Sequence, residues 1–167
     1  MKPRSELFNK LYKELRRLAV QRLGREAGGR GDATSLVHEA YLKLRIWGND
    51  FQDDKHFLAT ISKVIRQILV DRARRAACRN GLHEEISVSL DNARCESGVI
   101  DVLTLDELMN RLARFDSRAA QVTEMHVFLE LTEREIAEAL GISPRTVKRD
   151  WAIAKAWLKA ELAQASP

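Results

Sequence analysis

The sequence predicts an all-α protein made of two small helical domains, residues 1–80 and 101–163, joined by a flexible acidic linker over residues 81–100. Three observations indicate this fold class. Of the 167 residues, 6% are aromatic and 31% are charged, and there are three prolines. Apolar residues recur at the spacing of amphipathic helices along most of the chain. Two basic bodies are separated by an acidic connector.

The first domain is predicted to contain three helices, over residues 5–25, 33–47 and 55–79. The breaker GGRGD ends the first helix, and the loop GNDFQDD separates the second from the third. The third helix is apolar in its first half and basic in its second, since residues 63–82 hold six Lys/Arg against Asp71 alone. This pattern favours a compact helical body with an acidic partner.

The connector reverses the sign of the charge. Residues 83–107 hold seven acidic residues against Arg94. Residues 80–100 also lose helical periodicity and collect Asn, Gly and Ser, which is typical of an inter-domain linker. Two interpretations stay open at this point. The segment is either a solvated tether that only spans the distance between the two domains, or an acidic segment that folds back onto the basic residues 72–79 and masks them.

The second domain is predicted to begin with helices inside residues 102–112 and 117–129 and to end in a helix-turn-helix over residues 132–158. Thr132 is a good N-cap residue, and Glu135 three positions later completes a capping box. A capping box directly before an apolar-periodic segment marks the beginning of a helix. The first helix of the motif is therefore predicted to begin after Thr132.

The turn of this motif has an equally clear pattern. Gly141 stands where the end of a helix requires a left-handed residue, a conformation that glycine adopts at little cost. Ser143 can cap the next helix, and Pro144 occupies its first position, where the missing N–H costs nothing. Two helices joined by a turn of three or four residues are typical of DNA-binding helix-turn-helix motifs.

The second helix of the motif is amphipathic. Val147, Trp151, Ala154 and Leu158 recur at helical spacing and are predicted to face inward. The opposite side is basic, with Asp150 as the one opposing charge; arginines suit base edges in the major groove and lysines suit phosphates. The alternative is an ordinary helical hairpin with a solvated basic face. The residues predicted to bind DNA are Arg145, Thr146, Lys148, Arg149, Ala152, Lys155 and Lys159.

Charge and cysteine content indicate the kind of partner and the compartment. The formal charge of +4 and a sequence pI of about 9.3 favour an acidic partner. Cys78 and Cys95 have neither metal-ligand spacing nor a disulfide framework, so we interpret them as two thiols in a reducing cytoplasm. No signal peptide and no apolar run of membrane length is found.

Enzymatic chemistry has little support. The sequence contains no Gly-rich phosphate loop and no nucleophile motif. His38 with Glu39, and His126 with Glu124, stand one or two positions apart, so on a helix each pair points to different faces. We therefore expect no catalytic residue, no metal ligand and no cofactor.

Three segments together resemble the extracytoplasmic-function (ECF) group of bacterial sigma-70 factors. They are SLVHEAYLKL (residues 35–44), HFLATISKVIRQILVDRARR (residues 56–75) and the helix-turn-helix with ISPRTVKRDWAIAKAWL (residues 142–158). Many members of this group have an acidic pair where this chain has Thr34 and Ser35. The resemblance implies a sigma-two-like domain over residues 1–80 and a sigma-four-like domain over residues 101–163.

The resemblance also implies partners. The second helix is expected to dock on the coiled coil of the β′ subunit of core RNA polymerase, and the sigma-four-like domain is expected to read the −35 promoter element while resting on the β flap. An anti-sigma factor is a further candidate partner, and the linker would thread into the polymerase channel. The candidate polymerase-binding residues are Leu36, His38, Glu39, Leu42 and Lys43.

The third helix and the loop before it are expected, by the same resemblance, to engage the −10 element and an unstacked base. Basic side chains can track phosphates, and aromatic side chains can stack on bases. Trp47 and Phe57 are better explained as core residues, whereas Phe51 lies among polar loop residues. The candidate −10 residues are Asn49, Phe51, Lys63, Arg66, Arg72, Arg74, Arg75 and Arg79.

Two other functions compete with a sigma factor. The segment ISPRTVK also suits the helix-turn-helix of LuxR-like regulators, which act without sigma activity, but residues 1–80 lack the apolar strands of a receiver domain. An RNA-binding or architectural helical protein would explain the basic helices but not a capped helix-turn-helix.

Overall fold

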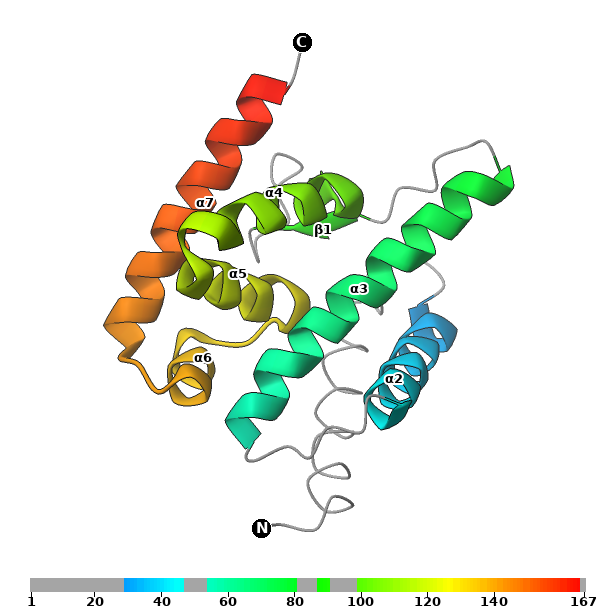
Figure 1. The fold of residues 1–167 in the computed structure, drawn as a ribbon, viewed down its shortest axis with the longest axis horizontal. Coiled ribbons are helices and arrows are strands. Elements are labelled where there is room, and N and C mark those ends of the chain that lie inside the picture. Colours follow the sequence, from blue (N-terminus) through cyan, green and yellow to red (C-terminus); the bar gives the residue numbers. More distant parts are fainter. Residues whose placement is uncertain (1–28, 47–53, 81–86, 91–98, 166–167) are drawn as a thin grey trace. The chain divides into compact units, whose positions relative to one another are not determined.

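The computed structural model describes residues 29–46, 54–80, 87–90 and 99–165 of the chain. These residues are almost entirely helical, which confirms the predicted all-α class (Figure 1). The helix predicted over residues 5–25 lies outside the described residues. The helices are α2 (Gly29–Ile46), α3 (Asp54–Asn80), α4 (Val102–Phe115), α5 (Ser117–Leu129), α6 (Glu133–Leu140) and α7 (Pro144–Ala165).

The chain divides into two compact units, residues 1–68 and residues 69–167. The boundary falls within α3, so this helix contributes to both units. The predicted domain limits at residues 80 and 101 remain a prediction.

In the first unit, α2 begins earlier than predicted. Gly29 opens the helix, four residues before the predicted position, so the segment interpreted as a breaker forms its first turn. Glycine is tolerated there because the first turn lacks intrahelical partners for its N–H groups. The buried side chains recur at helical spacing on one face of α2: Leu36, Val37, Ala40 and Leu44.

The first half of α3 is strongly buried. Phe57 is 1% exposed, which confirms its interpretation as a core residue. The other large buried side chains of this half follow the predicted helical spacing: Ile61, Val64, Ile65 and Ile68.

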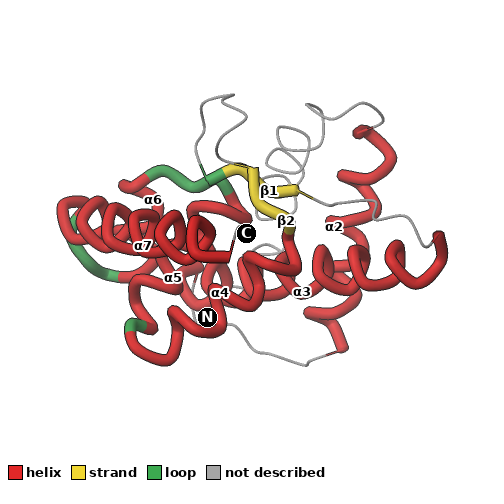
Figure 2. Tube along the Cα trace, turned by 90° about the horizontal axis from the view of Figure 1, so that it is seen from above, coloured by secondary structure: helices red, strands yellow, loops and turns green. Residues whose placement is uncertain are grey.

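The predicted linker contains structure that the sequence did not reveal. Strands β1 (Ser87–Ser89) and β2 (Val99–Asp101) pair antiparallel, with Val88 opposite Ile100 (Figure 2). Val88, Leu90 and Ile100 are buried. A strand of three residues is too short for its alternation of apolar and polar residues to be recognised in a sequence. From its sequence alone, the segment is therefore interpreted as an irregular linker.

The helices of the second unit pack around α5. This helix contacts α4, α6 and α7, and α4 also contacts α7 and β2. Asp101 ends β2 and at once caps α4, because its carboxylate accepts a hydrogen bond from the N–H of Thr104 at 3.1 Å. The largest fully buried side chains of this core are Leu105, Met109, Leu112, Met125, Leu129, Ile136 and Leu158.

Candidate nucleic-acid interface

The N-terminal end of α6 has the predicted capping box. The N–H of Glu135 donates to Oγ1 of Thr132 at 3.3 Å, and the N–H of Thr132 donates to Oε2 of Glu135 at 2.8 Å. Each residue satisfies a backbone donor that the helix leaves without an intrahelical acceptor. The beginning of the helix-turn-helix is therefore fixed locally, as the sequence predicts.

The turn also has the predicted geometry. Gly141 has φ 66° and ψ 34°, the left-handed conformation, and its N–H donates to the carbonyl of Ala137. The N–H of Ile142 donates to the same carbonyl at 3.0 Å. Ser143 accepts from the N–H of Thr146 at 3.1 Å, so it caps the helix that begins at Pro144. These bonds set the direction in which α7 leaves the turn.

The inner face of α7 agrees with the prediction. Val147, Ala154 and Leu158 are at most 1% exposed. Trp151 is half-buried, and its ring centroid lies 4.4 Å from that of His126 on α5. The predicted inward stripe is confirmed, and it attaches α7 to the body of the second unit.

The predicted DNA-binding residues lie on the remaining faces of α7. Thr146 and Lys155 are partly exposed, and the ammonium group of Lys155 lies 6.0 Å from the centre of the Trp151 ring. The exposed members of the set are Arg145, Lys148, Arg149, Ala152 and Lys159. Together they give the surface of α7 a basic character.

Asp150 does not lie on this basic face, contrary to the sequence interpretation. It is 3% exposed, and its Oδ2 accepts from Nε of Arg118 at 2.6 Å while its Oδ1 accepts from Nη2 of Arg118 at 3.3 Å. Nε and Nη2 of Arg149 donate to the same Oδ1 at 3.3 and 3.2 Å. A carboxylate that opposes DNA binding in the sequence is thus turned inward and paired with two arginines.

The spacing of Asp150 could have revealed its inward direction. It stands three residues after Val147 and four before Ala154, which places it on the inner stripe. Its partner Arg118 lies 32 residues earlier, on α5, and no local pattern connects the two. Arg118 is therefore the residue that sequence reasoning missed.

The charges of this cluster are mutually stabilised. Hydrogen bonding from Arg118 holds the pKa of the Asp150 carboxyl below its usual value, although burial acts in the opposite direction. The same hydrogen bond raises the pKa of Arg118. At neutral pH the cluster consists of two guanidinium groups and one carboxylate, so it keeps a net positive charge.

The predicted polymerase-binding residues on α2 divide by burial. His38 and Leu42 are exposed, and Leu42 is 49% exposed although it is a large apolar residue. Glu39 and Lys43 are partly exposed, whereas Leu36 is 2% exposed and lies with the buried side chains of α2. His38 and Leu42, one helical turn apart, are therefore the most exposed members of the set.

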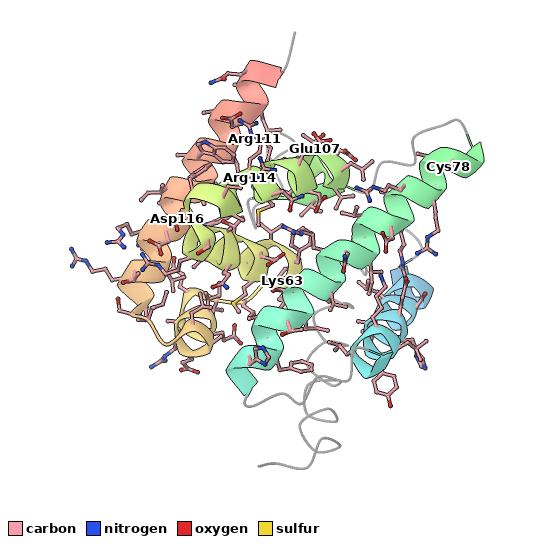
Figure 3. The ribbon with its side chains drawn as sticks, in the orientation of Figure 1. Lys63, Cys78, Glu107, Arg111, Arg114 and Asp116 are labelled. Atoms are coloured by element: carbon pink, nitrogen blue, oxygen red, sulfur yellow. The ribbon has the colours of Figure 1, made fainter. Side chains whose placement is uncertain are left out.

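The predicted −10 residues of α3 do not lie in one row. At 100° per residue, Lys63, Arg66 and Arg74 share one side of α3. Figure 3 labels Lys63 on this helix. Arg72 and Arg75 lie on the opposite side. The side chain of Arg79 lies outside the described part of the structure. One backbone strand of DNA could follow either set, not both. Asn49 and Phe51 lie outside the described residues, as does Trp47.

Among the described residues, no group of three His, Cys, Asp or Glu side chains could hold a metal ion. Cys78 is an exposed thiol on α3 (Figure 3). No described helix is both long and apolar enough to cross a membrane.

A capped helix-turn-helix with a basic exposed face on its second helix defines a DNA-binding protein of the helix-turn-helix class. The family model described as ECF sigma factor matches residues 2–164 of the chain. The chain therefore belongs to the ECF sigma factor family, whose members are non-enzymatic regulators that act in transcription initiation. Comparisons with curated proteins and with solved structures gave no match.

Proposed function

We propose that this sigma factor binds core RNA polymerase and directs it to promoters through two DNA contacts. The observation that carries the proposal is the capped helix-turn-helix, whose long helix α7 buries one face and exposes a basic one. In this proposal α7 enters the major groove of the −35 element. Helix α3 and the segment before it engage the −10 element.

Within α7, position along the helix separates two kinds of DNA contact. Arg145, Lys148 and Arg149 belong to the first two turns, which reach base edges when a recognition helix enters the major groove. Lys155 and Lys159 lie further along and follow a phosphate strand. Base contacts would supply sequence preference, and phosphate contacts would supply affinity that depends on salt.

In this proposal the first unit contributes to the contact with the −10 element and makes the main contact with polymerase. Exposed Leu42, beside His38, offers an apolar patch on α2 for the β′ coiled coil. Basic side chains of α3 follow the promoter near the −10 element, with Asn49 and Phe51 beside the melted strand. The remaining surface of the second unit rests on the β flap. Because polymerase is the partner, we place the protein in the cytoplasm, where an anti-sigma factor could compete for it.

In vitro transcription with core polymerase tests the proposal. A promoter is first selected from a randomised library by the holoenzyme, and run-off transcription is then measured with and without this protein. We expect transcripts only when core polymerase and the protein are both present. A variant with Arg145, Lys148 and Arg149 changed to Ala should lose this output while it keeps its helical circular dichroism spectrum.

The main alternative is a LuxR-like regulator, and the same material distinguishes it. Such a regulator would bind a defined operator tightly without core polymerase and would produce no transcripts from core polymerase alone. Tight, sequence-specific binding by the isolated protein, with no promoter-dependent output, would contradict the sigma-factor proposal.

A further inference from the structure

The buried carboxylate of Asp150 raises a question about the recognition helix. Removing a carboxylate from water is costly unless it is well paired, and an apolar residue at this inner position of α7 would avoid that cost. Here the carboxylate is 3% exposed and receives donors from Arg118 of α5 and Arg149 of α7. The pairing therefore suggests a task besides filling the interior.

Arg118 anchors the carboxylate from a second helix. It donates through Nε and Nη2 to the two different oxygens of Asp150, at 2.6 and 3.3 Å. Such a two-point contact fixes the plane of the carboxylate as well as its position. Asp150 thus cannot rotate about its own side-chain bonds without breaking at least one of these bonds.

The anchored carboxylate in turn holds Arg149 by one edge. Nε and Nη2 of Arg149 both donate to Oδ1 of Asp150, although 61% of the Arg149 side chain is exposed. A guanidinium group has five N–H donors, and this contact uses two of them. The remaining three donors, two on Nη1 and one on Nη2, lie at the outer end of the guanidinium group, away from Asp150.

That outer end matches one base. Guanine presents two neighbouring acceptors, O6 and N7, in the major groove, and a bidentate arginine is the usual partner of this pair. An arginine that is already held in one orientation loses less side-chain freedom when it binds. It also cannot turn easily to accept other base edges, so holding it favours guanine over the other bases.

We propose that Asp150, anchored by Arg118, is a positioning residue that holds Arg149 for bidentate contact with a guanine of the −35 element. This inference rests on the proposed promoter recognition by α7. Arg149 touches the base, Asp150 orients Arg149, and Arg118 holds Asp150 and balances its charge.

The test uses the full-length protein with core polymerase and the selected promoter, changed at each −35 position to each of the other three bases. The wild type should prefer guanine at one position by about 10-fold or more, the discrimination expected of a bidentate pair. Arg149→Ala should remove the preference at that position. Asp150→Asn should reduce it to about 3-fold or less at the same position, leave the other positions unchanged, and add no further loss in combination with Arg149→Ala, since coupled residues are not additive.

A matched control separates positioning from stability. Arg111 of α4 forms an ion pair with Glu161 of α7 at 2.8 Å, so this pair also joins α7 to another helix. Glu161 stands far along α7 from Arg149. Arg111→Gln should change output at all −35 variants equally and leave every base preference intact. Arg118→Lys keeps a charge beside Asp150 but loses the two-point contact, so it should weaken the guanine preference even if Asp150→Asn does not fold.

The outcomes distinguish this inference from the function on which it rests. If the wild-type holoenzyme shows no dependence on −35 bases, the proposed function fails. If the wild type prefers guanine at the Arg149-dependent position and both Asp150→Asn and Arg118→Lys keep that preference, the positioning role is overturned and the cluster only stabilises the fold. If Asp150→Asn and Arg118→Lys lower transcript output equally at all −35 variants, as expected for Arg111→Gln, the positioning role is overturned as well.

Discussion

Asp150 and Arg149 are neighbours on α7, yet 3% of one side chain and 61% of the other are exposed. At the scale of single residues, this difference in exposure separates the positions of α7 that pack against the protein from those that can contact a partner. Buried positions attach α7 to α5, and exposed positions remain available for a partner. Residue type alone does not make this distinction, because both side chains are charged and stand one position apart.

Mutations of the exposed basic residues should separate base contacts from phosphate contacts. Arg149→Ala should cost about 1–3 kcal/mol of promoter binding and relax the preference at one or two −35 positions. Lys155→Ala and Lys159→Ala should weaken binding to all sequences alike and lower the slope of log affinity against log salt by about one each. Salt titrations of holoenzyme binding give the slope, and the same titrations on promoters changed at single −35 positions give the base preference. Identical base preferences in all three variants would contradict the proposed groove-facing orientation.

The Asp150 cluster also predicts a dependence of stability on pH. The pKa of the Asp150 carboxyl is lowered in the folded protein, so its stabilising contribution is complete above its ordinary value of 3.8. This contribution is lost as the pH falls below 3.8 through the lowered pKa, because the unfolded state then binds the proton more readily. Urea unfolding as a function of pH should show the wild-type advantage over Asp150→Asn at neutral pH and its decrease in acid. An advantage that grows on acidification would contradict the assignment.

At the scale of elements, the helix-turn-helix is defined mainly by its own sequence. The caps at Thr132 and Ser143 and the left-handed Gly141 each depend on residues within four positions. For this reason both ends of α6 and the beginning of α7 could be predicted, whereas α7 runs to Ala165, beyond the predicted end of the motif at residue 158. The β1–β2 pair could not, because its stability comes from pairing across residues 90–98 and from burial of Val88 and Ile100, which short local patterns do not reveal.

Two helix ends with left-handed residues provide a matched pair of stability tests. A Cβ atom added at Gly141 would meet nothing within 4 Å, so Gly141→Ala should cost only the backbone term, about 1–2 kcal/mol. Glu130 ends α5 with φ 52°, a conformation that glycine adopts more readily. Glu130→Gly should therefore leave the free energy of unfolding unchanged or raise it. Chemical denaturation measures both, and an equal loss in the two variants would contradict this explanation.

At the scale of the whole molecule, the sequence predicted the order of the helices but could not assign individual basic residues to contacts. Helical spacing located the buried faces of α2, α3 and α7, because burial of an apolar stripe is a local property of an amphipathic helix. The basic residues of α3 lie on two sides, so composition overstated the size of any single DNA-binding face. The pairing of Arg118 with Asp150 depends on tertiary structure and has no local signal.

The proposed function predicts a strong difference between the isolated protein and the holoenzyme. Each DNA contact is small, and polymerase would hold both at a fixed distance, so the second contact forms at high effective concentration. We expect the holoenzyme to bind promoter DNA at least about 100-fold more tightly than the isolated protein does. Fluorescence anisotropy with labelled duplex, with core polymerase alone as the control, measures this ratio. A ratio near one would show that the contacts do not cooperate.

The burial of Asp150 also has a consequence for how promoter preference can diverge among descendants of such a protein. Arg145, Lys148 and Ala152 are exposed, and their side chains form no hydrogen bond or ion pair with other described residues. Each can be replaced alone without disturbing the fold, so the bases they face are open to gradual change. Arg149 is joined to Asp150 and through it to Arg118, so a new residue at 149 leaves a buried carboxylate with fewer donors. The recognition helix thus combines positions that can mutate singly with a trio whose members are expected to change together.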